Sequence, residues 1–460
     1  MKPTHQVRFW EIKVLRPDAK GRLRKRPYGV RWVTAGREHS EWFITKALAK
    51  AHLNKLVQAA NKGEAFDVET GLPESMYREL HSPTLLRVVQ EFLGDVWPDM
   101  SPNSRGRLVD GLAVAVQGFL DEEIDAKPAD VRRALTTLVL PPESARVVGN
   151  TRLGEIAEWL EQHSRKVAEL ADDSEVTRLG RKLLVKLDGS KSKVTTVNTR
   201  RGSLVQALSF AVDKQYLSAN PFSGWSPSRF QTGVAIDPGV VVNPVQARSL
   251  LAAVTYARPR GKNSSWLAFF ATLYFAGTRP GEARSLSEDN CQLPASGWGK
   301  LVLPNSLGKS AARLTDDGEM YQVRPLKHRP EEATREVPIP PELVRILSEH
   351  IDQAGTAEDG RLFRTAAGGP VPNASYTDIW RVARPYGLAP KQVASPLARR
   401  PYDLRHAAVS SWIAAGVPLP EVAQRAGHTV QMLTAVYAKV IYGSADQMNR
   451  RIESFLDDLD

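Results

Sequence analysis

The chain has 460 residues, 42% of them hydrophobic and 25% charged, with a net charge of +11. One ordinary hydrophobic core does not organise this length, so we expect two to four domains. The longest apolar run, Trp266 to Gly277, is about half of the ~20 residues that a membrane-spanning helix needs, and no signal segment opens the chain. We therefore expect a soluble, intracellular protein without a membrane partner.

The single cysteine, Cys291, excludes an internal disulfide framework. The nine histidines are scattered, and none stands at a spacing typical of a zinc site. We therefore expect neither a structural metal nor a cofactor.

The positive charge is concentrated at the start of the chain. Residues 1–62 hold fifteen Lys and Arg against four Asp and Glu, whereas the remaining residues hold 47 of each sign. Such a basic patch suits a polyanion, with an affinity that falls as salt rises because phosphate counterions are released. The alternative interpretation is a solvated basic face that keeps the protein soluble.

Strand-like stretches at 7–15, 27–34 and 41–44 precede a helix that starts after Thr45 and runs to about Asn61. They predict a three-stranded sheet backed by one helix, and such small sheets are one known way of reading a DNA groove. We expect Trp10, Trp32 and Trp42 mostly in the core. The predicted DNA contacts are Arg8, Arg22, Arg24, Lys25, Arg26 and Arg31.

After a linker at 63–75, the pattern from Ser82 to Ala219 is wholly helical. The amphipathic runs are 83–96, 103–121, 129–138, 153–170, 174–187 and 195–216. We expect Thr195 or Thr196 to cap the last helix. Arg200 and Arg201 lie off its buried face and are candidates to hold a DNA backbone, although most surface arginines are only solvated.

A Pro, Gly and Ser-rich stretch at 222–244 marks a domain boundary. The helices expected beyond it are Pro244–Val254, Ser264–Ala276, Pro341–Ile351 and Ala374–Ala383, and the strands are Lys300–Pro304, Met320–Leu326 and Thr334–Ile339. The end of the chain predicts an amphipathic helix with Met448, Ile452, Phe455 and Leu456 on one side. We expect this helix to dock onto a neighbouring protomer. The alternative is that it packs on its own domain.

Side chains suited to phosphoryl transfer follow one another through this last region. Two arginines can clamp a phosphate and a tyrosine can attack it. Arg279 follows a tight turn with Glu282 placed to brace it, Lys327 lies between two predicted strands that would form a hairpin, and Arg405 starts a helix opened by Asp403 as N-cap. His428 follows Gly427, and Tyr437 comes nine residues later. Each residue alone is a weak signal, but the ordered set is specific.

In this order the chain resembles the tyrosine recombinases, or phage-type integrases, and most of all actinobacterial integrases of mobile elements. The resemblance is carried by GTRPGEARSL, DLRHA and AGH, and by the spacing of 23 and then 9 residues from Arg405 to His428 and Tyr437. It extends to residues 1–62, similar to an arm-site binding domain, and to 195–221, similar to the last helix of a core-binding domain. The family's fold is multidomain and mainly α, with a mixed α+β catalytic domain containing a small antiparallel sheet.

The resemblance implies that Tyr437 attacks the scissile phosphate and forms a 3'-phosphotyrosine with a free 5'-hydroxyl. Arg279 and Arg405 would stabilise the phosphorane, Lys327 would protonate the leaving oxygen, and His428 would donate a hydrogen bond. A 5'-hydroxyl of the partner strand then reverses the reaction, without ATP or metal. The implied partners are double-stranded DNA attachment sites, three further protomers in a tetramer and a directionality factor, with no small-molecule substrate.

One position departs from the family pattern, since Tyr402 stands where a histidine usually begins His-x-x-Arg. A phenol with a reference pKa of ~10 is a poor base at neutral pH. We therefore expect Tyr402 to orient the phosphate. Deprotonation of Tyr437 would then depend on the positive field of the arginines, on a water molecule or on His406.

We expect an arm-site DNA-binding domain at residues 1–70, a helical core-binding domain at 71–228 and a catalytic domain at 229–460. The protein is expected to be cytoplasmic and nucleoid-associated in a bacterium. Two other functions remain open, namely a catalytically inactive DNA-binding protein on the same scaffold and a type IB topoisomerase. A housekeeping resolvase of chromosome dimers is disfavoured, because such recombinases ordinarily lack an arm-binding domain.

Overall fold

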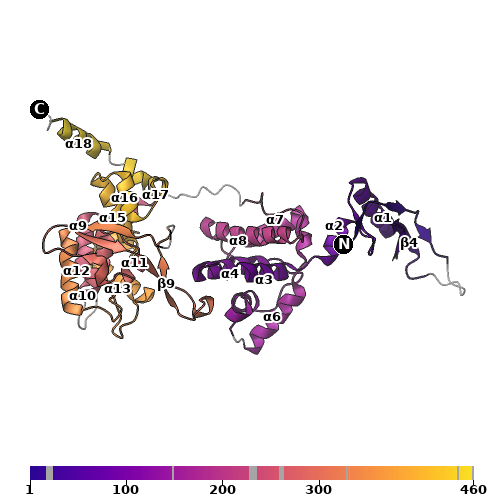
Figure 1. Cartoon of the computed structure of the whole chain (residues 1–460), viewed down its shortest axis with the longest axis horizontal. Helices are drawn as coiled ribbons and strands as arrows, with labels where there is room; N and C mark the ends of the chain where they lie inside the picture. Colours follow the sequence, from indigo (N-terminus) through magenta and orange to yellow (C-terminus); the bar gives the residue numbers. More distant parts are fainter. Residues whose placement is uncertain are drawn as a thin grey trace. The chain divides into compact units, whose positions relative to one another are not determined.

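The computed structural model describes residues 1–16, 24–147, 150–226, 236–257, 264–327, 330, 332–442 and 445–457. The chain divides into two compact units, Met1–Thr232 and Gly233–Asp460. Both are built mainly from helices, with small antiparallel sheets in each (Figure 1). The predicted fold class is thereby confirmed. Among the described residues, no helix combines the length and low polarity that crossing a lipid bilayer requires.

The first unit opens with a sheet centred on β4 (Tyr28–Thr34). One edge of β4 pairs with β5 (Arg37–Phe43), and β2 (Val7–Phe9) and β3 (Lys13–Val14) also pair with it. The first predicted strand is thus present as two short pieces on a common partner. A further pair joins β1 (Pro3–Thr4) to β6 (Phe66–Asp67).

Helix α1 (Lys46–Asn61) covers the sheet, and Thr45 is its N-cap, as predicted, because its hydroxyl accepts from the Leu48 amide at 3.3 Å. Trp32 is buried beneath this helix with Val30 and Leu56. Successive strand residues point to opposite faces. The β4 residues on either side of Val30 and Trp32 therefore point away from the helix.

The other face of the sheet carries Trp10 and Trp42, both half-buried. The Arg31 guanidinium lies over the Trp10 ring, 5.2 Å from its centroid. Trp42 pairs with Gly29, where an added Cβ would lie 2.6 Å from the indole ring. The expectation of a core position is therefore right for Trp32 and wrong for Trp10 and Trp42.

The rest of the first unit is helical. Its α-helices are α2 (Glu74–His81), α3 (Leu85–Val96), α4 (Pro102–Gln117), α5 (Pro128–Ala134), α6 (Thr151–His163), α7 (Asp173–Leu183) and α8 (Val194–Asp213). Helix α4 packs against α8. The predicted cap of α8 is wrong, because Lys193, which precedes Thr195 and Thr196, is the N-cap and makes no side-chain capping bond. Thr195 and Thr196 are helical residues.

In the second unit, strands pair as β11–β8–β7 and as β10–β9. Their bounds are β7 (Cys291–Gln292), β8 (Gly299–Leu303), β9 (Asn305–Lys309), β10 (Tyr321–Pro325) and β11 (Arg335–Ile339). The predicted hairpin of β10 with β11 is wrong, because β10 pairs with β9 and β11 pairs with β8. β9 therefore occupies the place beside β10 that was predicted for β11. The last residue of β10 pairs with Asn305, and the first residue of β11 pairs with Leu303. The segment 326–334 connects these two strands in the sequence.

The helices of this unit are α9 (Pro244–Val254), α10 (Ser264–Phe275), α11 (Pro280–Arg284), α12 (Pro341–Ala354), α13 (Asn373–Gly387), α14 (Pro390–Ala394), α15 (Asp403–Ala414), α16 (Leu419–Ala426), α17 (Val430–Tyr442) and α18 (Ala445–Asp457). The apolar α10 packs against α9, α12 and α15 (Figure 1). Its Phe269 and Phe270 are fully buried in the main core. This packing fixes the C-terminal end of α10, from which the candidate site is built.

Candidate active site

Arg279 is held at the start of α11 by the turn that ends α10. Gly277 makes this turn with a φ of 56°, and an added Cβ there would lie 2.7 Å from the Trp412 ring. The Glu282 carboxylate accepts from the Arg279 backbone amide and from its Nη1, both at 2.7 Å. Nη2 of Arg279 donates to the Gly427 carbonyl at 3.0 Å. One guanidinium thus connects α11 to the loop before α17.

Arg405 lies in the first turn of α15 and is completely buried. Its guanidinium donates to the Gly277 and Ala426 carbonyls, and its Nη2 lies 3.0 Å from Nε2 of His428. Asp403 is the first residue of the helix and Tyr402 its N-cap, so the predicted cap is wrong. The Asp403 carboxylate instead accepts from the Arg400 amide at 2.8 Å.

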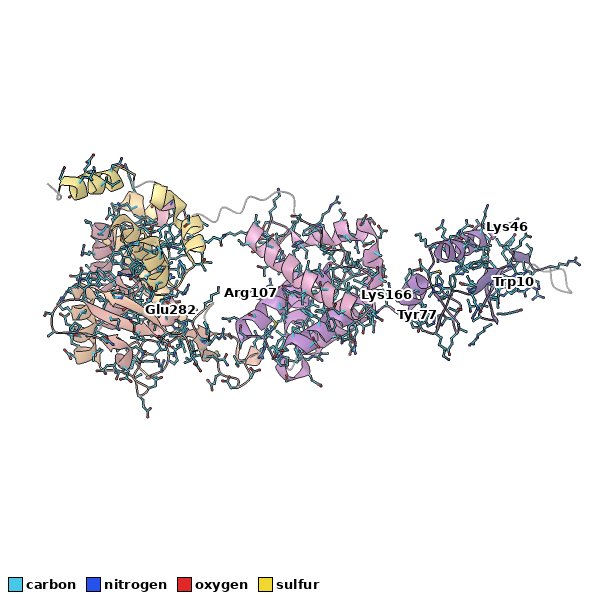
Figure 2. All side chains as sticks on the ribbon, turned by 45° about the horizontal axis from the view of Figure 1, so that its top comes forward. Trp10, Lys46, Tyr77, Arg107, Lys166 and Glu282 are labelled. Carbon is cyan, nitrogen blue, oxygen red and sulfur yellow. The ribbon has the colours of Figure 1, made fainter. Side chains whose placement is uncertain are left out.

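Glu282 is the acidic centre of the site, buried inside the second unit (Figure 2). Arg335, at the start of β11, donates to both carboxylate oxygens at 3.1 and 2.6 Å. Arg405 Nη1 lies 4.0 Å from Glu282 Oε2. Burial alone would raise the pKa of Glu282, but the guanidiniums of Arg335, Arg405 and Arg279 outweigh it and lower the pKa to about 2. The carboxylate therefore stays ionised at neutral pH.

Arg335 is a residue that the sequence reading missed. It also donates to the Ala426 carbonyl at 3.2 Å, so it ties β11 to the end of α16. An arginine opening a strand whose other inward residues, Val337 and Ile339, are apolar was the available signal. Its partner stands 53 residues away in sequence, which hid the pairing.

His428 follows α16, where Gly427 adopts the left-handed conformation with a φ of 62°. Because the Arg405 guanidinium can only donate, Nε2 of His428 accepts and the ring hydrogen lies on Nδ1. Nδ1 is buried without a hydrogen-bond partner in the described part of the chain. Burial, followed by the charges of Arg405 and Arg279, lowers the pKa of His428 to about 3. This histidine is a neutral ring with one unused donor.

Tyr437 lies on α17, where its own backbone departs from helical geometry with φ −105° and ψ 16°. The Val436 carbonyl accepts from the Ile236 amide at 2.8 Å. The phenol is buried, and its Oη lies 3.1 Å from Nδ1 of His406. Burial raises the pKa of Tyr437, while Arg405 and Arg279 act in the opposite direction. The phenol thus lies within the electrostatic reach of both predicted arginines.

Tyr402 faces the same group of rings. Its ring meets the His406 ring edge-on, with centroids 5.1 Å apart. Burial, the largest effect, lowers the pKa of His406 to about 4, so this imidazole is neutral at pH 7. His406, not Tyr402, contacts the Tyr437 hydroxyl.

Lys327 is the predicted residue that the structure does not join to the others by a described contact. It is exposed and lies two residues beyond the end of β10, in the segment that leads to β11. Arg335, at the other end of that segment, belongs to the buried cluster. The role of Lys327 stays a prediction.

The predicted DNA contacts of the N-terminal sheet differ in their surroundings. Arg8, Arg24, Lys25 and Arg26 are exposed, whereas Arg31 is half-buried, with Glu38 at 3.6 Å. Arg22 lies outside the described residues. The pairing of Arg8 with Val33 puts it on the same face as Arg31, away from α1.

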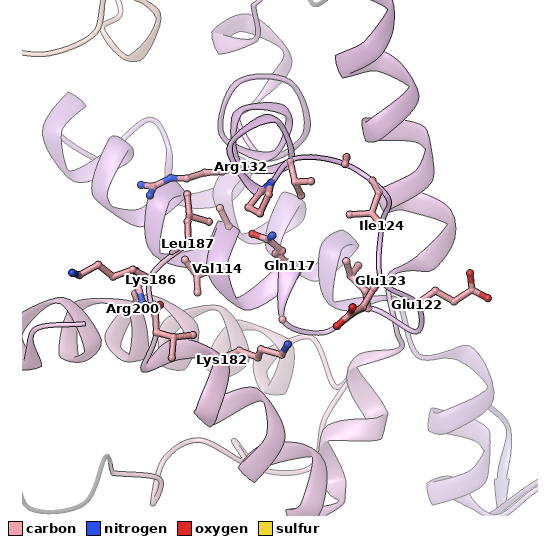
Figure 3. A pocket seen from close by; sticks show the side chains of 17 residues that line it. Val114, Gln117, Glu122, Glu123, Ile124, Arg132, Lys182, Lys186, Leu187 and Arg200 are labelled. Atoms are coloured by element: carbon pink, nitrogen blue, oxygen red, sulfur yellow. Dashed lines mark hydrogen bonds between the residues drawn. The ribbon is translucent and has the colours of Figure 1, made fainter. Parts of the chain in front are cut away.

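Arg200 and Arg201 make hydrogen bonds within their own domain. Arg200 lines a cavity of about 320 Å³ among α4, α5, α7 and α8 (Figure 3), and its Nη1 donates to the Leu183 and Val185 carbonyls at 2.8 Å. Arg201 donates to the Trp225 and Ser223 carbonyls at 2.5 and 2.9 Å. Both arginines therefore have a structural role, and their contact with DNA stays a prediction.

Comparison with known proteins finds similar solved structures. The Tn1549 transposon integrase in complex with a circular intermediate DNA is 20% identical, with a TM-score of 0.47 over 66% of this chain and 94% of that one. The XerH site-specific recombinase bound to palindromic difH is 12% identical, with a TM-score of 0.44 over 75% and 97%. A lambda integrase tetramer bound to a Holliday junction is 9% identical, with a TM-score of 0.45 over 87% and 93%.

No family model and no curated protein matches this chain. At these identities and scores, the similarity to solved structures does not decide what the chain does. That question rests on the site itself.

Proposed function

We propose that this protein is a site-specific DNA recombinase of the tyrosine type, an integrase of a phage or another mobile element. One observation carries the proposal. Arg279 and Arg405 both lie against the buried Glu282 carboxylate, His428 contacts Arg405, and the Tyr437 hydroxyl contacts His406, the residue that follows Arg405 on α15. A buried tyrosine hydroxyl beside the helix that carries Arg405 suits attack on a phosphodiester, because guanidiniums stabilise the negative charge on the phosphoryl oxygens.

Each residue has a role in this reaction. Tyr437 attacks the scissile phosphate to form a 3'-phosphotyrosine, and the bond to the 5' oxygen breaks. Arg279 and Arg405 hold the non-bridging oxygens, and the unused Nδ1 donor of His428 adds a hydrogen bond. Tyr402 orients the phosphate, and Lys327 delivers a proton to the leaving oxygen. The 5'-hydroxyl of another strand then attacks the phosphotyrosine and rejoins the DNA.

The remaining parts of the chain position the DNA. We propose an arm-site binding domain at residues 1–70, a core-binding domain at 71–228 and a catalytic domain at 229–460. The sheet face that carries Arg8, Trp10 and Arg31 would contact the arm site, together with four basic residues that precede β4 in the sequence, namely Arg22, Arg24, Lys25 and Arg26. Arg200 and Arg201 belong to the proposed core-site contact. Four protomers would act on two synapsed sites in the cytoplasm of a bacterium, at the nucleoid.

The test is a nicked suicide substrate, which traps the covalent protein–DNA adduct because the cleaved fragment diffuses away. The candidate crossover site is to be found by sequencing the DNA that flanks the gene and searching it for a direct repeat. We expect the wild-type protein to form an adduct, and the Tyr437→Phe variant to bind the same DNA without forming one. If the wild-type protein bound the site and gave no adduct, the inactive DNA-binding protein would be the correct function.

A topoisomerase would behave differently in a second assay. It would relax supercoiled plasmid that lacks the crossover site, and removing residues 1–62 would not change that activity. We expect relaxation to require the site, because the proposed arm and core contacts position the scissile phosphate.

A further inference from the structure

His406 is the one described side chain with a hydrogen bond to the proposed nucleophile. Its Nδ1 lies 3.1 Å from the Tyr437 Oη, and the two ring centroids are 6.0 Å apart. His406 stands on α15 and Tyr437 on α17, which pack against each other. The contact is therefore made between two helices and is not a by-product of local sequence.

The tautomer of His406 decides what this contact can do. With its hydrogen on Nε2, Nδ1 accepts from the phenol hydroxyl; with its hydrogen on Nδ1, the ring donates to the phenol oxygen. Only the first arrangement lets a proton leave the nucleophile. A neutral imidazole can serve as this acceptor at pH 7, and burial keeps the ring neutral by lowering the pKa of His406 to about 4.

The charged and titratable groups around His406 determine how tightly the ring would hold a second proton. They are Tyr402, Asp403 and Arg405 on or beside its own helix, Arg400 before that helix, His428 before α17 and Tyr437 on α17. Asp403 is the acidic group among them and favours the protonated ring, while Arg405 and Arg400 oppose it. A proton gained by the ring would therefore be held weakly and returned when the phosphotyrosine is resolved.

Tyr402 does not compete for this proton. Its ring lies edge-on to His406, and it makes no hydrogen bond to Tyr437 among the described residues. A phenol would also have to lose its own proton before it could accept one, since its reference pKa is ~10. The position that usually holds a histidine in the resembled family is therefore not the base in this chain.

Resting on the proposed function, we propose that His406 is the general base that takes the proton from Tyr437. The Tyr437 O–H bond breaks as the phosphorus–oxygen bond forms, and the proton moves to His406 Nδ1. The bond from phosphorus to the 5' oxygen breaks, and that oxygen receives its proton from Lys327. In the rejoining step both protons return, so atoms and charge balance over the cycle.

The test is the single-turnover rate of adduct formation on the suicide substrate, measured from about pH 6 to about pH 9. We choose His406→Asn because the shorter amide keeps a polar atom near the position of Nδ1 but cannot take up a proton. We expect the variant to form adduct ~10²- to 10⁴-fold more slowly at pH 7. Its rate should rise ~10-fold per pH unit, since the phenolate must then form before it attacks, whereas the wild-type rate should stay flat.

Two further variants separate a base from a merely structural residue. Tyr402→Phe should slow adduct formation but keep the flat pH profile of the wild type. A fluorinated tyrosine at position 437, whose phenol is more acidic, should recover much of the rate lost in His406→Asn. DNA binding and unfolding temperature of His406→Asn should match the wild type.

Three outcomes would overturn the assignment, namely a His406→Asn variant at the wild-type rate, a slow variant with the flat profile, or no recovery with the fluorinated tyrosine. In all three the wild-type protein still forms its adduct, so the proposed function survives. Failure of the wild-type protein to form any adduct would instead refute the proposed function.

Discussion

Nη2 of Arg335 lies 2.6 Å from Oε2 of Glu282, and both side chains are 1% exposed. This ion pair joins β11 to α11 in the interior of the second unit, with Arg279 and Arg405 as further cationic neighbours of the same carboxylate. Removing two charges from water is costly, and the attraction offsets that cost only while both partners are present. The pair therefore fixes the frame on which the two predicted catalytic arginines stand.

Glu282→Gln should destabilise the second unit strongly. The amide cannot balance the buried guanidiniums, and breaking a buried pair by removing one partner costs ~3 to 5 kcal/mol. Urea denaturation of the wild-type and variant proteins measures the difference.

Glu349→Gln is the matched control, because Arg345 and Glu349 are also 2.6 Å apart but their side chains are 63% and 49% exposed. We expect a change of at most ~0.5 kcal/mol for this exposed pair on a helix. Equal effects of the two variants would contradict the role given to burial.

The burial of His350 predicts how the free energy of unfolding depends on pH. Its Nε2 lies 2.9 Å from the Leu362 carbonyl and donates to it, and its Nδ1 is buried without a hydrogen-bond partner in the described part of the chain. Burial lowers the pKa of His350 below its usual value of 6.5, because a proton on Nδ1 would find no acceptor. Its contribution to stability is therefore complete above pH 6.5 and is lost as the pH falls below that value.

The measurement is the free energy of unfolding from pH 7 down to about pH 5, where one such group contributes a slope of up to ~1.4 kcal/mol per pH unit. His350→Gln keeps a donor for the Leu362 carbonyl but does not titrate. We expect its curve to be flatter than that of the wild type. Parallel curves would show that His350 does not titrate on unfolding.

Arg405→Lys and Arg279→Lys should separate structure from chemistry. The single amine of a lysine cannot replace the guanidinium of Arg405, which serves the Gly277 and Ala426 carbonyls, and the unsatisfied groups should cost ~1 to 3 kcal/mol. Arg279 is partly exposed, so its replacement should cost less stability. Both variants should slow adduct formation ~10²- to 10³-fold. An Arg279→Lys variant with the wild-type rate would remove Arg279 from the proposed mechanism.

Sequence reasoning worked best where the relevant contacts are local. The capping of α1 by Thr45 and the bracing of Arg279 by Glu282 both act over three residues, and both are present. It failed where pairing is distant. Arg335 pairs with a carboxylate 53 residues away, and β9 has the sequence NSLGK, which lacks the apolar alternation of a strand.

The same limit explains the misplaced tryptophans of the sheet and a question that the sequence leaves open at the site. Trp10 and Trp42 are large and apolar, which favours a core position, but Trp42 pairs with Gly29 and Trp10 lies against Arg31, both on the outer face. The sequence leaves open whether the arginine-rich field, water or His406 deprotonates Tyr437, and the contact with His406 depends on how α15 and α17 pack. No periodicity in the sequence carries that information.

Lys327→Ala should lose the acid that protonates the leaving 5' oxygen. A substrate with sulfur in place of that bridging oxygen needs no such proton, because a thiolate leaves readily. We expect adduct formation by Lys327→Ala to drop ~10²- to 10⁴-fold on the ordinary substrate and to recover on the sulfur substrate.

Lys309→Ala is the control for Lys327→Ala, since Lys309 lies at the end of β9 with its Nζ 5.5 Å from the centroid of the Tyr321 ring. Adduct formation by Lys309→Ala should not depend on whether the bridging atom of the substrate is oxygen or sulfur. If the sulfur substrate rescued Lys309→Ala and not Lys327→Ala, Lys309 would be the acid.

Helix α18 carries the prediction about assembly. Ile452 and Leu456 stand one helical turn apart, and they are 58% and 57% exposed. Two neighbouring apolar side chains with this exposure favour a partner, and the prediction is a second copy of this chain. Ile452→Ser combined with Leu456→Ser should reduce recombination between two sites by more than ~10-fold, while DNA binding by a single protomer stays within ~2-fold of the wild type. The reason is that the two apolar side chains are buried only at the predicted contact between protomers, so their loss weakens that contact alone. Glu453→Ser combined with Asp457→Ser, on the neighbouring face, should recombine like the wild type. An equal loss of binding and recombination in the apolar double variant would mean that α18 packs on its own domain.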